Sequence, residues 1–158
     1  CRSEDALRRI AHAFDTLFSD AVFDVIVCGG WTMGMVGRRI AIARSRRTKR
    51  PVRAPVVEGY SSPVFSEDLP AGSNTLLLTD VVITGKLTAR LRDVVRRYGA
   101  SVAGIGCIAI PTESVEADRS GVRALTVVDM DLQDPTQAQC PRCATHRKMV
   151  FNPIAAQM

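Results

Sequence analysis

Residues 74–98 constrain the fold of this chain most strongly. Residues 76–78 are all leucine, and such a continuous apolar run is typical of a strand buried on both faces of a parallel sheet. Asp80 follows at the carboxyl end of this predicted strand, and apolar residues at helical spacing then run to a stop at Gly99. The N–H groups at a helix N-terminus are unsatisfied and attract anions, so the stretch predicts a site for a phosphorylated sugar.

Other segments predict a repeated alternation of strands and helices. Residues 3–18 form an amphipathic pattern with Ser3 as N-cap, and His12 lies off the apolar stripe as a solvated residue. Residues 23–28 predict a strand, followed by a glycine-containing loop, Cys28–Gly34, and a helix through about Arg44. Further strands are expected at 52–57, 101–110 and 124–129. This order indicates an α/β fold with a doubly wound, mostly parallel sheet flanked by helices.

The segment LTDVVITGKLT, residues 78–88, resembles the ribose-phosphate-binding motif of the type I phosphoribosyltransferases. That motif has two acids after an apolar strand and then Thr-Gly, a basic residue or Gly, and a hydroxyl residue. Asp80 takes the place of the second acid, whereas Thr79 stands where the first acid is expected and Leu87 replaces a hydroxyl residue. The alternative is an ordinary βα unit in an unrelated doubly wound domain.

The resemblance implies roles for residues of both predicted strand-loop-helix units. Asp80 would be catalytic and would bind the ribose hydroxyls. The 5′-phosphate would lie on Thr84, Gly85, Lys86, Leu87 and Thr88, and the pyrophosphate on Gly29, Gly30, Trp31, Thr32 and Met33. Trp31 would sit at the mouth of the site, where we expect it to pack rather than to stack on a base. Only one helix precedes the first core strand, so the family's substrate-covering hood is expected to be small or missing.

The function that the resemblance implies is transfer of the phosphoribosyl group from phosphoribosyl pyrophosphate (PRPP) to a nucleobase. The base would be orotate-like or another pyrimidine or purine, Mg²⁺ would accompany PRPP, and the protein would be a homodimer. The alternative is a catalytically weak, regulatory protein that binds PRPP or a nucleotide. Thr79, Leu87 and the loop 58–72, which contains no Lys or Arg, favour this alternative. The polar candidates in that mobile loop are Tyr60, Ser61 and Ser62.

Composition sets the broader class of the protein. The chain has 158 residues, 46% hydrophobic and 23% charged, which suits one globular core at residues 1–130 and a tail at 131–158 packed on it. No apolar run reaches membrane length, and five cysteines without secretory features favour reduced thiols in the cytoplasm. The net charge is +5, and six basic residues fall within 44–53. A nucleic-acid patch there is the weaker hypothesis, because solvated cations also suit a helix C-terminus.

The tail contains Cys140 and Cys143, with His146 three residues further on. Two cysteines at this spacing are typical of half a zinc site or of a redox pair. Only His146 is a further local ligand, so bound zinc, free thiols and an oxidisable pair all stay open. The tail is also similar to the Cys-Pro-x-Cys segment near the end of some orotate phosphoribosyltransferase-like proteins, and the resemblance therefore points to orotate-type relatives.

Overall fold

The computed structural model describes residues 2–58, 64–111 and 121–128 of the chain. Its helices are α1 (Arg2–Leu17), α2 (Trp31–Thr48) and α3 (Lys86–Arg97). Its strands are β1 (Val25–Gly29), β2 (Val56–Glu58), β3 (Val64–Phe65), β4 (Asn74–Val81), β5 (Ser101–Pro111) and β6 (Val122–Val128). None of the helices in these ranges is long and apolar enough to cross a membrane.

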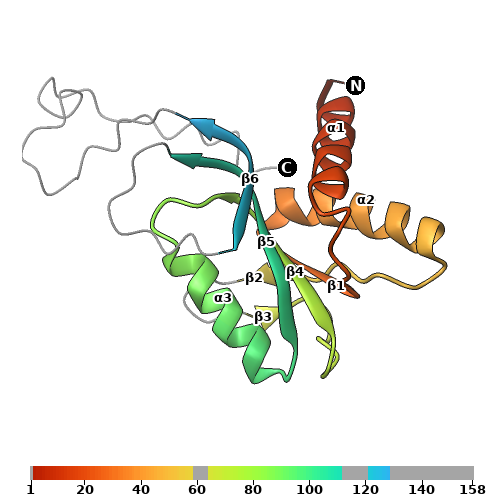
Figure 1. The fold of residues 1–158 in the computed structure, drawn as a ribbon, viewed down its shortest axis with the longest axis vertical. Coiled ribbons are helices and arrows are strands. Elements are labelled where there is room, and N and C mark those ends of the chain that lie inside the picture. The colour runs from red at the N-terminus through yellow and green to blue at the C-terminus, as the bar shows by residue number, and fades with distance from the viewer. Residues whose placement is uncertain (1, 59–63, 112–120, 129–158) are drawn as a thin grey trace, which may run out of the picture.

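The strands form one six-stranded sheet in the order β3-β2-β1-β4-β5-β6. Every neighbouring pair is parallel except β2 and β3, which are antiparallel. Helices α1 and α2 cover one face of the sheet and α3 covers the other, as Figure 1 shows. The predicted α/β class with a doubly wound, mostly parallel sheet is confirmed.

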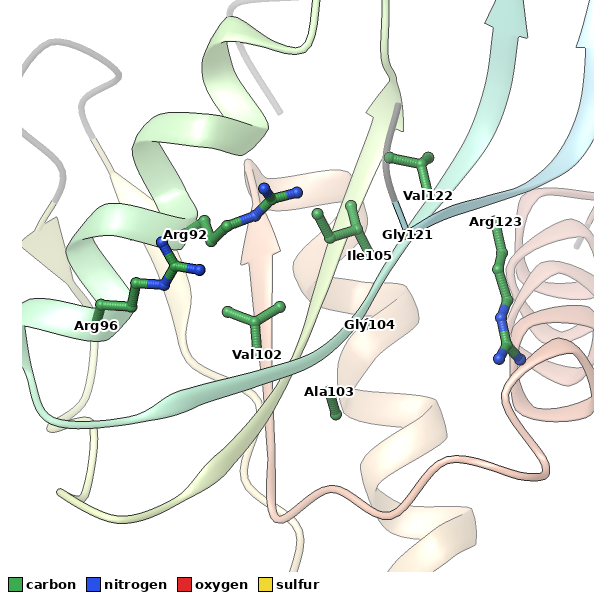
Figure 2. A pocket seen from close by; sticks show the side chains of 9 residues that line it. All are labelled: Arg92, Arg96, Val102, Ala103, Gly104, Ile105, Gly121, Val122 and Arg123. Atoms are coloured by element: carbon green, nitrogen blue, oxygen red, sulfur yellow. The ribbon is translucent and has the colours of Figure 1, made fainter. Parts of the chain in front are cut away.

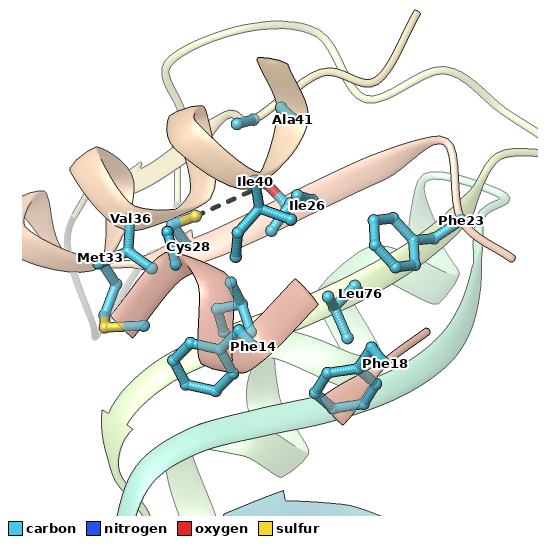
Figure 3. Close-up of a cluster of buried hydrophobic side chains, with 13 residues drawn as sticks. Phe14, Phe18, Phe23, Ile26, Cys28, Met33, Val36, Ile40, Ala41 and Leu76 are labelled. Carbon is cyan, nitrogen blue, oxygen red and sulfur yellow. Dashed lines mark hydrogen bonds between the residues drawn. The ribbon is translucent and has the colours of Figure 1, made fainter. Parts of the chain in front are cut away.

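The two faces of the sheet have separate cores because successive strand residues point to opposite sides. Ile26 and Leu76 point toward α1 and α2, where they meet the buried Phe14 and Phe18, and Figure 3 shows these side chains together. The other core, beneath α3, consists of Val25, Val27, Val57, Leu69, Leu77, Leu91, Val95, Ala100 and Ile105. The leucines at 76–78 therefore serve both cores, which explains why that run is continuously apolar.

The apolar stripe predicted for the first helix is confirmed, since Phe14 and Phe18 of that stripe are fully buried. His12 is exposed, as expected. The predicted N-cap is wrong, because α1 already begins at Arg2 and Ser3 lies inside it.

The basic residues within 44–53 were expected to be solvated, and this expectation is wrong for Arg44. Its side chain is buried, and its Nε lies 2.7 Å from Asp15 Oδ1. Its guanidinium also donates to the backbone oxygens of Asp15, Phe18 and Ala21. These carbonyls lie in the last turn of α1 and in the residues just beyond it, where the backbone oxygens lack the N–H donors of a continuing helix. Arg44 thus caps α1 from α2, while Arg47 pairs with the same Asp15 from a more exposed position.

Two other boundaries differ from the sequence prediction. The second strand begins at Val56 rather than at 52, because Pro51 and Pro55 have no N–H to donate to a sheet ladder. Arg53 still makes an isolated parallel bridge with Val25. The long connection from residue 58 to 72 contains the short edge strand β3, whose Phe65 ring meets Tyr98 edge-on at a centroid distance of 5.2 Å.

Candidate functional site

The first candidate turn joins β1 to α2 and is shorter than the sequence predicts. Helix α2 already starts at Trp31, so the loop between strand and helix reduces to Gly30. Gly30 is the N-cap with φ 85° and ψ 166°, a conformation that other residues rarely adopt, and no side chain of the described residues caps the helix. The first intrahelical bond runs from Gly34 N to Gly30 O at 3.0 Å. The N–H groups of residues 31–33 consequently have no acceptor within the helix.

The second candidate turn joins β4 to α3 and repeats this arrangement. Gly85 is the N-cap, in the left-handed region at φ 73°, and again no side chain caps the helix. Ala89 N donates to Gly85 O at 2.9 Å, so the amides of residues 86–88 precede the first intrahelical bond. Thr84 Oγ1 lies 3.4 Å from Lys86 N, a long contact for a hydrogen bond. Neither α2 nor α3 has an acid in its first turn, which leaves the positive end of each helix dipole unneutralised.

Asp80 lies on the exposed end of β4, next to the second turn. Its Oδ1 accepts a hydrogen bond from Val81 N at 2.8 Å and from the hydroxyl of Thr79 at 3.3 Å. Thr79 itself is buried. From the sequence Thr79 is only a departure from the motif, whereas the structure shows that it contacts the acid that remains. The signal available in the sequence is simply a hydroxyl residue directly before that acid.

The two turns meet at the carboxyl edge of the sheet because β1 and β4 are parallel neighbours. Their register pairs Val25 with Thr75 and Cys28 with Leu78. One step further on, a Cβ placed on Gly29 would lie 3.6 Å from Thr79 Oγ1, so the end of β1 lies beside the residue that precedes Asp80. The fold therefore brings together two uncapped helix N-termini and one carboxylate, which are groups that bind anions and sugar hydroxyls respectively.

No family model matches the chain. Its arrangement of strands and helices is nevertheless that of solved phosphoribosyltransferases. An adenine phosphoribosyltransferase from Thermoanaerobacter pseudethanolicus superposes with a TM-score of 0.63 over 79% of this chain and 82% of that one, at 14% identity. The orotate phosphoribosyltransferase of Mycobacterium tuberculosis in complex with PRPP gives 0.59 over 75% and 71%, at 22% identity. The chain has the type I phosphoribosyltransferase fold. The resemblance predicted from residues 78–88 is confirmed at this level.

A relative of similar kind is found by sequence. A hypoxanthine/guanine phosphoribosyltransferase from Methanocaldococcus jannaschii is 28% identical over 98 residues, or 59% of this chain. The match spans about half of that protein, 54% of its length. Adenine, orotate and hypoxanthine/guanine proteins all appear among these neighbours, so they do not distinguish one base from another.

The predicted phosphate-binding residues differ in what their side chains do within the phosphoribosyltransferase fold. Lys86 is exposed, whereas Leu87 packs against the core beneath α3. Thr88 is buried and its hydroxyl donates to Gly85 O at 2.7 Å, so only its backbone N–H faces the turn. Met33 is likewise buried beneath α2 and offers a backbone amide alone. Trp31 corrects our expectation of a packed side chain, because 72% of it is exposed.

Two groups of predicted site residues lie outside the residues that the structure describes. They are Tyr60, Ser61 and Ser62 of the predicted mobile loop, and Cys140, Cys143 and His146 of the tail. In the described ranges the cysteines Cys28 and Cys107 are buried. Burial raises the pKa of the Cys28 thiol to about 12, which suits a core residue rather than a reactive one.

A separate hollow of about 420 Å³ lies between α3 and the strands β5 and β6. Figure 2 shows Arg92 and Arg96 reaching from α3 over Val102 and Ile105, while Arg123 points away toward α1. The hollow covers the first half of β5, whereas both candidate turns lie at the carboxyl ends of β1 and β4. It is therefore not part of the candidate site.

Proposed function

We propose that this protein binds PRPP and transfers its phosphoribosyl group to a nucleobase with release of pyrophosphate. The observation that carries the proposal is the pair of uncapped, glycine-initiated helix N-termini beside Asp80, at the carboxyl edge of adjacent parallel strands. In open parallel sheets this edge is where ligands bind. PRPP has a 5′-phosphate at one end of its ribose and a pyrophosphate at the other, and two anion-binding turns flanking one carboxylate match that chemistry.

The turn before α3 would hold the 5′-phosphate and the turn before α2 the pyrophosphate. Gly85 and Gly30 allow the backbone to present its amides without a Cβ in the way. Lys86 adds a cation at the first turn of α3. With both ends of PRPP fixed, the anomeric carbon is held in one orientation toward the incoming base, and such fixation supplies much of a two-substrate reaction's acceleration.

In the reaction, the bond from the anomeric carbon to the pyrophosphate oxygen breaks and a bond from that carbon to a base nitrogen forms. The ribose becomes cationic in the transition state. The carboxylate of Asp80 would accept hydrogen bonds from the ribose hydroxyls and stabilise this positive charge. Its Oδ1 is already oriented by Thr79 and Val81, and among the described residues no donor occupies Oδ2. That oxygen is thus the one available to the sugar.

Mg²⁺ accompanies PRPP in this proposal and would be shared between Asp80 and the substrate. Within residues 2–58, 64–111 and 121–128 no three His, Cys, Asp or Glu side chains gather into a metal site. One exposed carboxylate is nonetheless enough, because Mg²⁺ is commonly held by one or two carboxylates together with phosphate oxygens and water. When bound, the ion would neutralise charge on the leaving pyrophosphate.

The second candidate is a regulatory protein that binds PRPP or a nucleotide with little turnover. The observation that favours it is that Thr79 gives the site one carboxylate where the family motif has two acids.

Our proposal also includes that the protein is a homodimer and lies in the cytoplasm, which analytical ultracentrifugation and cell fractionation would test. The accepting base would be identified by assaying a panel of orotate, uracil, adenine, hypoxanthine and guanine.

Isothermal titration with PRPP and Mg²⁺, followed by a pyrophosphate-release assay on that panel, tests both candidates. Binding with release supports the transferase, binding without release supports the regulatory protein, and no binding removes both. Gly85→Ala should weaken PRPP binding at least about tenfold, because a Cβ at φ 73° strains the turn and obstructs the phosphate. Gly99→Ala is the matched control, since Gly99 has φ 74° but lies beyond the other end of α3. Equal losses in both variants would contradict the assignment of the turn.

A further inference from the structure

Exposed apolar side chains border the two candidate turns. Trp31 is the first residue of α2 and is 72% exposed, and Ile83, in the turn before α3, is 40% exposed. Val81, at the end of β4, is 36% exposed. Leaving an indole in water forgoes the stabilisation that its burial would give the fold. Apolar groups that gather at the edge of a polar site mark a binding surface.

In the part of the chain that the structure describes, the Trp31 ring meets no other aromatic ring and no arginine. The aromatic contacts there join Phe65 to Tyr98, and the arginines that lie over rings do so on Phe23 and Phe18. The neighbouring Met33 points into the core beneath α2, so the helix is anchored without the indole. Among the described residues, most of the indole surface is consequently left open to a ligand.

The backbone places Trp31 beside the ribose position. Gly29, two residues before Trp31, lies beside Thr79, and Thr79 directly precedes Asp80. Ile83 lies three residues after Asp80, in the turn that follows β4. The two apolar side chains therefore belong to the two turns that would hold the ends of PRPP, and the carboxylate lies at the end of β4, the strand that leads into the second turn.

We propose that Trp31 is the stacking platform for the accepting base and that Ile83 contacts the same ring. This inference rests on the proposed function and names the residues that recognise its second substrate. A planar nitrogen heterocycle buries apolar area on an indole face, which fixes the ring plane while its edge remains free for the attacking nitrogen. The backbone N–H of Trp31 stays available for the pyrophosphate. The side chain and the backbone of this residue therefore act on different substrates. The larger ring overlap of a purine makes its dependence on Trp31 greater than that of a pyrimidine.

Trp31 is the sole tryptophan of the chain, so its fluorescence reports on this position alone. We expect free protein to show the emission of a water-exposed indole. Adding hypoxanthine or orotate to protein saturated with PRPP and Mg²⁺ should quench that emission and shift it to shorter wavelength. Trp31→Ala should raise the KM for the base roughly tenfold to a hundredfold, as removal of an aromatic platform does for a stacked base. The same variant should leave the KM for PRPP within about twofold, because the backbone amide remains.

Two variants control this experiment. Trp31→Phe keeps a ring and should retain most of the base affinity. Ile42→Ala removes another exposed apolar side chain of α2, 54% exposed and three turns along the helix, and should change neither KM.

If Trp31→Ala binds PRPP and turns over with an unchanged KM for the base, the inference is overturned while the proposed function stands. A blue-shifted emission of the free protein that varies with protein concentration would overturn it too, because the indole would then lie between two copies. If the unaltered protein does not bind PRPP, the proposed function itself is contradicted.

Discussion

The hydroxyl of Thr79 donates a hydrogen bond across 3.3 Å to Oδ1 of Asp80, the residue that follows it. Thr79 is buried, so its hydroxyl holds a fixed position, whereas Asp80 is exposed at the strand end. A donor at this place restrains the carboxylate without adding a second charge. The single acid of the site is therefore oriented by the residue that stands where the family motif has another acid.

Thr79→Val should lower turnover by at most about tenfold, since a hydrogen bond to a charged group is worth roughly 1.5–3 kcal/mol, and this one is long at 3.3 Å and reaches a solvated carboxylate. Valine has nearly the shape of threonine, so we expect the free energy of unfolding to change by less than about 1 kcal/mol. Thr79→Ser keeps the donor and should restore turnover. The measurement is kcat and KM from pyrophosphate release, and equal activity of the Val and Ser variants would show that the hydroxyl has no orienting role.

Asp80→Asn keeps the shape of the side chain and removes its charge. If the protein is a transferase, kcat should fall by about a hundredfold or more while PRPP affinity changes less, because the charge matters most when the ribose is cationic. If it is a regulatory protein, only PRPP affinity should fall. Steady-state kinetics and calorimetry together separate these cases. Intact binding with intact turnover would mean that the ribose lies elsewhere.

Arg44→Met should lower the free energy of unfolding by about 3 kcal/mol, because it leaves Asp15 and the terminal carbonyls of α1 without their buried donor. Arg46→Met is the control: Arg46 lies at the same end of α2 but is exposed, and its loss should cost at most about 0.5 kcal/mol. Urea unfolding measures both values. Similar losses in the two variants would show that the cap at Arg44 contributes little.

The stability of the fold should fall in acid through Asp15. Burial raises the pKa of its carboxyl, but hydrogen bonds from Arg47 and Arg44 outweigh burial and leave that pKa below its ordinary value. A lowered folded-state pKa means that the contribution is fully present above the unfolded pKa of about 3.9 and is lost as pH falls through the folded value. Asp15→Asn should therefore flatten the decline in urea midpoint below about pH 4.

The control for this pH dependence is Asp93→Asn. Asp93 is exposed and lies 4.0 Å from Arg96, which is itself exposed, so the pair contributes little. In Asp93→Asn the urea midpoint should fall with decreasing pH as steeply as it does in the unaltered protein. If the urea midpoint of Asp15→Asn also fell as steeply as that of the unaltered protein, the acid sensitivity would belong to other carboxylates.

The sequence by itself determined the class of fold and the location of the second turn. Three consecutive leucines predicted a strand buried on both faces, which is confirmed because a parallel sheet needs apolar residues on each side. Gly99 predicted the end of the helix that follows, which is confirmed because α3 ends at Arg97 and Gly99 has a positive φ that few other residues adopt. Thr84-Gly85-Lys86 indicated a βα turn from its own letters alone. Local patterns of this kind are readable because they depend on neighbours within a few residues.

Contacts between distant segments could only come from the tertiary structure. The basic run looked uniformly solvated, yet Arg44 is buried because Asp15 and the end of α1, 29 residues away, fold against it. Gly34 looked like part of a loop but lies in α2, where a Cβ would overlap Val56. Trp31 is exposed as the first residue of α2, and the backbone angles of Gly30 that place the helix start there are not displayed by the sequence. The meeting of Gly29 with Thr79, which joins the two turns into one site, follows from the register of two strands whose pairing is non-local.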